Sequence, residues 1–246
     1  MKEQALKVGT QFHNDIVNSV KFDIKPFLAE TDSGLKFNSK TIIIATGAQA
    51  RWLNLESENK FKGFGISACA TCDGFFFKDQ NIIVVGGGNS AVEEALYLTN
   101  FASKVTLVHR RDELRAEKIL QERLFNHPKI EVVWNHTVDQ FIGTEEPLSL
   151  NKIKLKNTHD NSEKIINATG AFIAIGHDPS TSLFKNKIKM DSENYILTKS
   201  DSTETNIKGV FAAGDVKDKV FRQAVTAAGM GCMAALEAEK YIAENY

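Results

Sequence analysis

The sequence predicts an α/β fold in which one doubly wound domain is inserted into another. Residues 81–134 alternate between short apolar runs and longer mixed stretches, in the order strand, helix, strand, helix, strand. Such alternation is typical of a parallel sheet with helices packed on its faces. The flanking segments share a second pattern, an apolar run that ends at a glycine, at 41–47 and 210–214. We therefore expect the two flanks to form one domain that the chain leaves and re-enters.

The individual elements follow from local patterns. The N-terminal part predicts a helix at 2–9 and strands at 24–31 and 35–38, around a turn signal at 32–34. The β-branched run at 41–45 predicts a strand buried on both faces. In the central block we expect strands at 81–85, 105–109 and 130–134, with helices at 90–99 and 115–125. Antiparallel strands are expected within 138–174, a buried strand whose end is residues 173–176, another buried strand at 210–213, and a long helix at 222–244.

The expected domain boundaries place residues 52–177 in the central domain, and residues 1–51 and 178–246 in the flanking one. A formal net charge of -1 gives no basic excess for binding nucleic acid. No apolar run reaches the roughly 18 residues of a membrane span. The first residues lack the apolar core of a signal peptide, which indicates a cytoplasmic protein.

A glycine-rich turn lies between the first strand and the first helix of the central block. Residues 86–91 read G-G-G-N-S-A and match the G-x-G-x-x-A pattern that binds a dinucleotide pyrophosphate. The pattern recurs at 63–68 and 229–234, but the first copy follows no strand and the second lies inside a helix. The alternative is an ordinary tight turn. The residues expected to bind the pyrophosphate are Gly86, Gly88, Asn89, Ser90 and Ala91.

Basic residues follow the second strand, where NAD-binding domains carry an acidic residue for the ribose hydroxyls. His109, Arg110 and Arg111 stand there, and Arg115 follows. Guanidinium groups bind phosphate and offer no acceptor to a hydroxyl. The alternative, a solvated basic helix start, is less favourable because cations destabilise a helix N-terminus. The sequence therefore predicts NADPH, with the arginines on its 2′-phosphate.

Two of the three cysteines, Cys69 and Cys72, form a C-x-x-C element. A structural zinc site would need a second ligand pair, and the sequence offers none. A redox dithiol needs only this spacing, and Asp73 is placed to carry a proton. The alternative for the pair is two ordinary buried thiols, which is the interpretation we adopt for Cys232. Because direct hydride reduction of a disulfide is unusual, a flavin is expected between NADPH and the dithiol.

Seven motifs, in order along nearly the whole chain, resemble those of the low-molecular-weight thioredoxin reductases, within the pyridine nucleotide–disulfide oxidoreductase class. They are A-T-G at 45–47, C-A-T-C-D-G at 69–74, G-G-G-N-S-A at 86–91, H-R-R-D at 109–112, A-I-G-H at 174–177, F-A-A-G-D at 211–215 and R-Q-A at 222–224. The resemblance implies that electrons pass from NADPH through FAD to a Cys69–Cys72 disulfide and on to thioredoxin. It also implies a homodimer and a rotation of the central domain.

The resemblance implies particular roles for single residues. Cys72 would face the flavin and Cys69 would attack the thioredoxin disulfide. Phe75 and Phe76 resemble an aromatic surface that docks thioredoxin, the alternative being packing in the core. The FAD contacts implied lie in the flanking domain. They are Thr46, Gly47, Gly214, Asp215, Arg222, Gln223 and Ala224, of which Asp215 would bind the ribityl chain and the last three would start the helix facing the flavin ring.

One family feature is not found in the sequence. Family members open with a βαβ unit whose glycine turn holds the FAD pyrophosphate, and nothing before Thr41 supplies the roughly 30 residues of such a unit. The FAD-binding domain is therefore expected to be incomplete, and this chain is expected to bind NADPH but to purify without flavin. Two alternatives to the main function are another flavin-dependent disulfide reductase and an inactive NADPH-binding fragment.

Overall fold

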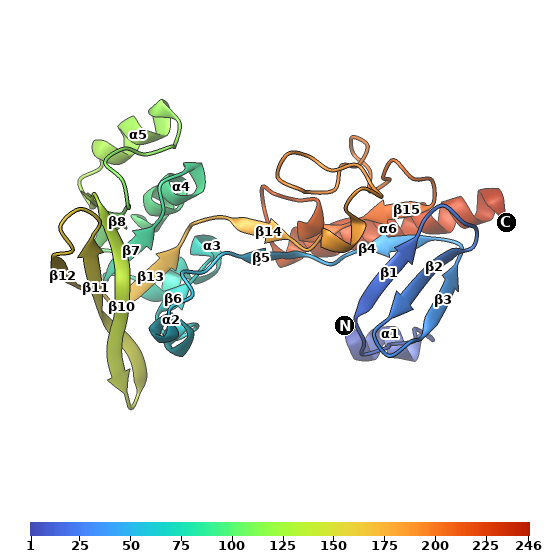
Figure 1. The fold of residues 1–246 in the computed structure, drawn as a ribbon, viewed down its shortest axis with the longest axis horizontal. Helices are drawn as coiled ribbons and strands as arrows, with labels where there is room; N and C mark the ends of the chain where they lie inside the picture. Colours follow the sequence, from blue (N-terminus) through green and yellow to red (C-terminus); the bar gives the residue numbers. More distant parts are fainter. The chain divides into compact units, whose positions relative to one another are not determined.

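The computed structural model describes residues 1–246, which form two compact units. Unit 1 consists of Met1–Gln49 and Asp178–Tyr246, and unit 2 consists of Ala50–His177. Both mix helices and strands, so the predicted α/β class is confirmed (Figure 1). No helix of the chain is both long enough and apolar enough to cross a membrane.

Unit 2 is built on a five-stranded parallel sheet in the order β6-β13-β7-β8-β9. Its strands are β6 (Ile66–Ser67), β7 (Asn81–Val85), β8 (Lys104–Val108), β9 (Ile130–Val133) and β13 (Gly170–Ile173). Helix α4 (Asn89–Leu98) connects β7 to β8, and α5 (Lys118–Phe125) connects β8 to β9. The predicted strand–helix alternation over 81–134 is therefore present.

Strand β7 is buried on both faces, because helix α4 covers one face and an antiparallel sheet covers the other. Ile82 and Val84 pack in one cluster with the apolar side of α4, whereas Ile83 and Val85 pack in another. The second cluster includes residues of the antiparallel sheet formed by β10 (His136–Glu145), β11 (Leu148–Asn157) and β12 (Glu163–Asn167). The uninterrupted apolar run at 82–85 follows from this two-sided burial.

Helix α5 begins at Lys118, so the prediction that it begins at Arg115 is wrong. The side-chain amide of Gln121 donates to the carbonyl oxygens of Leu114 and Ala116, at 3.3 and 2.6 Å. These bonds hold the preceding residues in a loop rather than a helical turn. Strand β6 had no counterpart in our predictions, and neither did three short helical elements near the start of unit 2. They are α2 (Glu56–Phe61), α3 (Ala70–Asp73) and the 3-10 turn η1 (Gly74–Phe77).

Unit 1 combines an antiparallel sheet with a parallel strand pair and a long helix. The sheet contains β1 (Val17–Lys21), β2 (Phe27–Thr31) and β3 (Lys36–Ser39), and helix α1 spans Lys2–Lys7. Strand β1 was not predicted, and β2 starts three residues later than expected. Residues 1–40 thus hold one helix and an antiparallel sheet, and contain no parallel βαβ unit.

The parallel pair consists of β4 (Ile42–Ile44) and β15 (Val210–Ala212). Val210 and Ala212 pack in one core cluster, with Phe27 and Ile44. Phe211 points to the other face, where it packs with small residues of helix α6 (Ala224–Asn245). The remaining elements are β5 (Ala48–Ala50), paired with β14 (His177–Pro179), and the 3-10 turns η2 (Ser182–Phe184) and η3 (Gly214–Val216).

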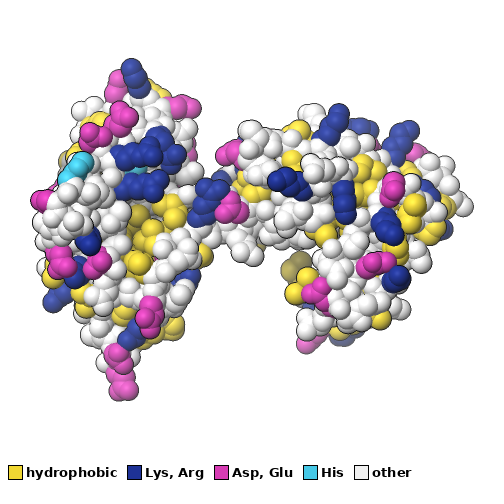
Figure 2. All heavy atoms as spheres, viewed as in Figure 1, with side chains coloured by type: hydrophobic (Ala, Val, Ile, Leu, Met, Phe, Trp, Pro, Cys, Tyr) yellow, Lys and Arg dark blue, Asp and Glu magenta, His cyan; other side chains and the backbone are white.

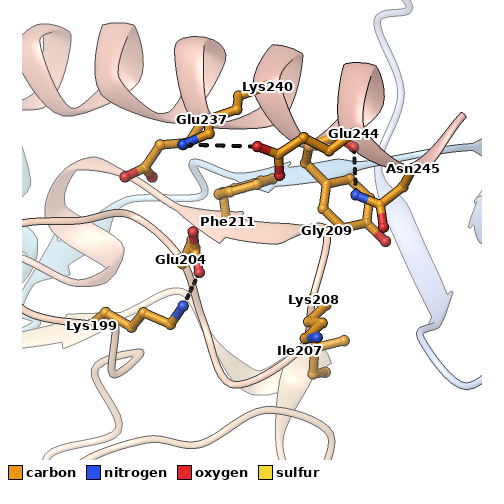
Figure 3. A pocket seen from close by; sticks show the side chains of 11 residues that line it. Lys199, Glu204, Ile207, Lys208, Gly209, Phe211, Glu237, Lys240, Glu244 and Asn245 are labelled. Carbon is orange, nitrogen blue, oxygen red and sulfur yellow. Dashed lines mark hydrogen bonds and ion pairs between the residues drawn. The ribbon is translucent and has the colours of Figure 1, made fainter.

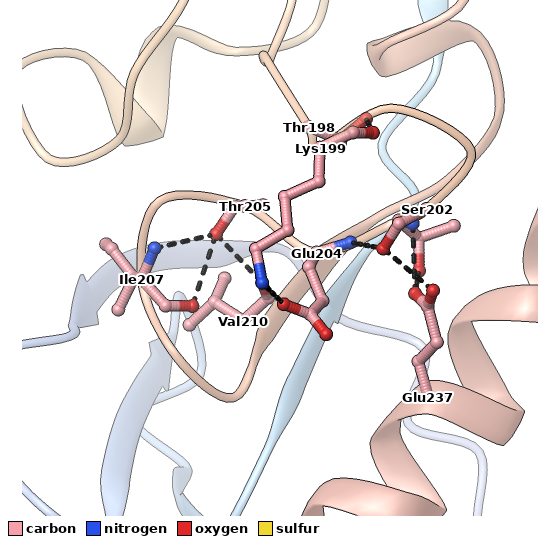
Figure 4. Close-up of polar contacts among 9 residues, drawn as sticks. Thr198, Lys199, Ser202, Glu204, Thr205, Ile207, Val210 and Glu237 are labelled. Atoms are coloured by element: carbon pink, nitrogen blue, oxygen red, sulfur yellow. Dashed lines mark hydrogen bonds and ion pairs between the residues drawn. The ribbon is translucent and has the colours of Figure 1, made fainter.

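Glu237 of α6 holds the loop that leads into β15 (Figure 4). Its carboxylate accepts from the hydroxyl of Ser202 at 2.7 Å and from the backbone N–H of Thr203 at 2.9 Å. A cleft of about 370 Å³ lies between α6 and this loop, with charged residues of both signs such as Lys199 and Glu244 (Figure 3). None of the residues expected to bind FAD lines this cleft.

Candidate functional site

The glycine turn lies between β7 and α4, as the pyrophosphate motif requires. A Cβ at Gly86 would lie 2.4 Å from the carbonyl oxygen of Ala174 and 2.6 Å from the Cβ of Ala91, so no side chain fits there. A Cβ at Gly88, by contrast, would meet no atom within 4 Å. The space above Gly88 is therefore open, as expected where a phosphate approaches the start of a helix.

His109 supports this turn from behind. Its side chain is only 6% exposed, and its Nε2 is buried without a hydrogen-bond partner. A Cβ at Gly87 would lie 2.2 Å from the imidazole Cε1, so ring and turn are in close contact. Burial lowers the pKa of His109, which favours the neutral ring beside two cationic arginines.

The predicted arginines all lie exposed on the loop between β8 and α5. The backbone N–H of Arg115 donates to the carbonyl of Gly87 at 2.7 Å, which fixes the loop against the glycine turn. Asn89 accepts from the backbone N–H of Glu117 at 2.8 Å, so this predicted pyrophosphate ligand already has a structural bond. Figure 2 shows Lys and Arg side chains gathered on one part of the unit that contains α4 and α5.

Cys69 and Cys72 form a disulfide with a Cα–Cα distance of 5.3 Å. Cys69 caps the short helix α3 and is half-buried, whereas Cys72 is exposed. Three backbone N–H groups fix the segment. The N–H of Cys69 donates to Ser67 Oγ at 3.0 Å, and the N–H of Cys72 donates to Cys69 Sγ at 3.2 Å. The N–H of Asp73 donates to the carbonyl oxygen of Cys69 at 3.1 Å. The alternative of two ordinary buried thiols is therefore wrong for this pair.

Cys232 is also exposed, so the prediction that it is a buried thiol is wrong. It lies on α6, where burial is confined to Ala234 and Ala238 because these face β15. Small residues in a helix predicted close packing on every side, but only one side of α6 meets the core. The chain contains no group of three or more His, Cys, Asp and Glu side chains that could hold a metal ion.

Aromatic side chains stand exposed directly after the disulfide. Phe75 and Phe76 are 68% and 72% exposed, so the alternative that they pack in the core is wrong. The ring of Phe75 lies 6.3 Å from that of Phe101, which in turn lies 5.5 Å from Tyr97. Three of these rings are exposed and Phe101 is half-buried between them. Such a cluster is characteristic of a protein-binding surface.

The residues expected to bind FAD meet at one edge of unit 1. Because β4 and β15 are parallel, Thr46-Gly47 and Gly214-Asp215 both follow the carboxyl ends of neighbouring strands. Both glycines have positive φ, 72° and 75°, which turns the chain sharply after each strand. A Cβ on Gly214 would lie 3.3 Å from that of Ala227, so the glycine also lets this turn approach α6 closely.

Helix α6 begins at Ala224, two residues after the predicted start. Gln223 is its N-cap, and Arg222 has a positive φ of 49° that no helix could continue. The cause is Asp218, a buried carboxylate that accepts backbone N–H bonds from residues 220 and 221 through Oδ1 and from Arg222 through Oδ2, at 2.9–3.2 Å. This bonding folds the chain tightly before the helix.

Burial raises the pKa of Asp215, and the charge of Asp218 raises it further. An ionised carboxylate in this position is therefore costly unless a ligand supplies hydrogen-bond donors. The hydroxyls of a ribityl chain are such donors. Together with the open turn at Gly47 and the N–H groups at the start of α6, this carboxylate fits a flavin nucleotide.

Comparisons with known proteins establish the class to which this site belongs. Residues 3–231 match the family model described as pyridine nucleotide-disulphide oxidoreductase. The chain belongs to that family.

Its relatives define the type of enzyme within the family. The chain is 59% identical over 242 residues to the thioredoxin reductase of Rickettsia felis, covering 98% of this chain and 78% of that protein. It is 48% identical to the thioredoxin reductase of Coxiella burnetii, covering 98% of this chain and 77% of that protein. A crystal structure of thioredoxin reductase from Streptococcus pyogenes superposes with a TM-score of 0.92 at 39% identity, covering 98% and 78% of the two chains. The chain is an oxidoreductase of the thioredoxin reductase type, which uses FAD and NADPH.

Proposed function

We propose that electrons pass from NADPH to the Cys69–Cys72 disulfide and then to the disulfide of thioredoxin, with NADPH bound in unit 2 and FAD in unit 1. The observation that carries this proposal is a partly exposed disulfide in the same unit as an open glycine turn. FAD, when bound, accepts the hydride of NADPH and delivers an electron pair to the disulfide.

The glycine turn and the arginine loop of unit 2 would bind NADPH. Gly88 leaves room for the pyrophosphate, and α4 begins immediately after it with free backbone N–H groups. Arg110, Arg111 and Arg115 would bind the 2′-phosphate, since their side chains are exposed on a loop that is bonded to the turn. His109 would act by holding the turn in shape.

The cysteines of unit 2 carry out the exchange chemistry. Reduction breaks the bond between Cys69 and Cys72 and leaves two thiols, one of them ionised. The Cys69 thiolate attacks the partner disulfide, and one partner sulfur leaves with the electron pair. Cys72 then attacks Cys69, which restores the internal disulfide and releases the reduced partner. Asp73, next to Cys72, would carry a proton during these steps.

The partner would dock on the aromatic surface formed by Phe75, Phe76, Phe101 and Tyr97. These rings begin three residues after Cys72 and would bury apolar area against a partner that presents its disulfide there. A homodimer is also proposed, supported by apolar side chains such as Val225 and Leu236 that stand exposed on α6. A reducing compartment such as the cytoplasm would suit this dithiol chemistry.

Three serine variants test the proposal in protein loaded with FAD. Cys69→Ser and Cys72→Ser should abolish NADPH-driven reduction of thioredoxin, because each lacks one sulfur of the exchange. Cys232→Ser is the matched control and should keep full activity. NADPH should still bleach the flavin absorbance in all three variants. Full thioredoxin reduction by either single variant of the pair would refute the proposed route.

A further inference from the structure

The sulfur of Cys69 receives two hydrogen bonds from within its own turn. The backbone N–H of Cys72 donates to it at 3.2 Å, and the hydroxyl oxygen of Thr71 lies 3.4 Å from it. Because a disulfide sulfur carries no hydrogen, the Thr71 hydroxyl must be the donor in this second contact. Thr71 is itself exposed, so its side chain does not serve to fill the core.

We propose that Thr71 is a catalytic residue whose hydroxyl stabilises the negative charge that the Cys69 sulfur carries during disulfide exchange. The inference rests on the proposed function of the Cys69–Cys72 pair. It adds that Thr71 makes the Cys69 sulfur a better leaving group and lowers the pKa of the Cys69 thiol. Sulfur anions accept hydrogen bonds more strongly than neutral sulfur, so the Thr71 bond strengthens when charge develops.

The Cys69 sulfur is charged at two points of the reaction. When an electron pair enters at Cys72, the Cys69–Cys72 bond breaks and its electrons leave on Cys69. The resulting thiolate then attacks the partner disulfide, forming a mixed disulfide while the departing partner sulfur takes up a proton. Attack of Cys72 on Cys69 finally displaces the second partner sulfur. Both donors to Cys69 are present before the first step and need not move to act.

Cys69 is also held in position by its neighbours. Its backbone N–H bond to Ser67 and its carbonyl bond from Asp73 fix the residue on both sides. The hydroxyl of Thr71 therefore meets a sulfur of fixed position, as preorganised stabilisation of charge requires. A purely structural role for the same bond, as a local cap of α3, predicts a loss of stability and no change in thiol acidity.

The test measures the acidity of Cys69 directly, in a chain that carries Cys72→Ser and Cys232→Ser so that one thiol remains. Thiolate formation is followed by ultraviolet absorbance and by the rate of alkylation with iodoacetamide as pH rises. One hydrogen bond contributes roughly 0.5–1.5 kcal/mol, so Thr71→Val should raise the pKa of the Cys69 thiol by about 0.5–1 unit. Below that pKa, alkylation should become about 2- to 3-fold slower, because a smaller thiolate fraction is partly offset by a more nucleophilic sulfur.

Two further variants separate the role of the hydroxyl from the shape of the side chain. Thr71→Ser keeps the donor and should restore the acidity, whereas Thr144→Val removes a hydroxyl bonded to the Pro147 carbonyl in the β10–β11 turn and should leave it unchanged. With both cysteines present and at a pH where Cys69 is ionised, Thr71→Val should shift the equilibrium with glutathione toward the disulfide, because the lost bond is stronger to the thiolate than to the disulfide sulfur. An unchanged pKa in Thr71→Val, or no recovery in Thr71→Ser, would overturn the proposal. Neither titration needs NADPH, FAD or thioredoxin, so failure of the electron route would not obscure the result.

Discussion

Removing Arg110 and Arg115 together should weaken the binding of NADPH far more than that of NADH. Both side chains are exposed on the loop that is bonded to the glycine turn, and the two nucleotides differ only in the 2′-phosphate. A double substitution to alanine leaves the backbone bond from residue 115 to Gly87 in place. The turn that would bind the pyrophosphate common to both nucleotides should therefore be little affected.

The expected magnitude follows from the exposure of these side chains. A charge-assisted hydrogen bond contributes roughly 1.5–3 kcal/mol, but solvent screening reduces this to about 1 kcal/mol for an exposed guanidinium. Two such contacts give about 2 kcal/mol, or roughly a 30-fold rise in Kd for NADPH. Added salt should reduce the difference between parent and variant, since exposed charges are screened.

Isothermal titration with each nucleotide measures the effect, and Arg123→Ala on α5 is the matched control. Arg123 is also exposed but follows the start of α5, beyond the loop. It should change neither affinity. Equal losses for NADPH and NADH in the double variant would refute the assignment of the arginines to the 2′-phosphate.

Three further perturbations concern the turn and the aromatic surface. Gly87→Ala should destabilise unit 2 by about 1–3 kcal/mol in chemical unfolding, because its Cβ would overlap the His109 ring, while Gly88→Ala should leave folding unchanged and weaken NADPH. The folded state lowers the pKa of His109, so its contribution to stability is present above pH 6.5 and is lost as the pH falls below it. Thermal unfolding at a series of pH values should show a smaller acid loss in His109→Gln than in the parent. Replacing Phe75 and Phe76 by serine should raise the KM for thioredoxin with little change in flavin reduction, and an unchanged KM would remove them from the docking surface.

The parallel core of unit 2 was predictable because burial on both faces leaves a direct trace in sequence. The apolar run at 82–85 can lie only between two packed layers, and the glycines at 86–88 mark its end. The same reasoning located β15, which is buried throughout, and β4. The prediction that β4 is buried on both faces is wrong, however, because Ile43 is 40% exposed. Strand β1 was missed because only Val20 of its five residues is buried, which leaves no alternation to detect.

Features that depend on single polar side chains were not predictable in this way. Glu58 is fully buried because its carboxylate accepts the backbone N–H groups of Leu53 and Asn54, at 3.0 and 2.9 Å. Asp218 bends the chain ahead of α6 by the same means. Many backbone N–H groups near each carboxylate in the sequence could donate to it. Which of them do so depends on the folded structure.

The candidate site was predicted in part. Sequence motifs located the cysteine pair, the glycine turn and the arginine loop. They did not reveal that His109 lies behind the turn, or that Thr71 bonds to Cys69. The sequence contained one indication of the Thr71 bond. Threonine hydroxyls near the start of a helix commonly form hydrogen bonds with neighbouring groups of the same segment.

In each unit, a backbone hydrogen bond joins the two segments that connect it to the other unit. In unit 2, the backbone N–H of Arg51 donates to the carbonyl of Gly176 at 2.9 Å, so the first and last residues of the inserted segment are neighbours. In unit 1, the N–H of Ser180 donates to the carbonyl of Gly47 at the same distance. Because its two ends lie close together, such a segment can be expressed as a separate domain. The two ends of the remaining chain can then be joined by a short linker. We therefore expect residues 50–177 to fold on their own, with the glycine turn and the Cys69–Cys72 disulfide in the same segment.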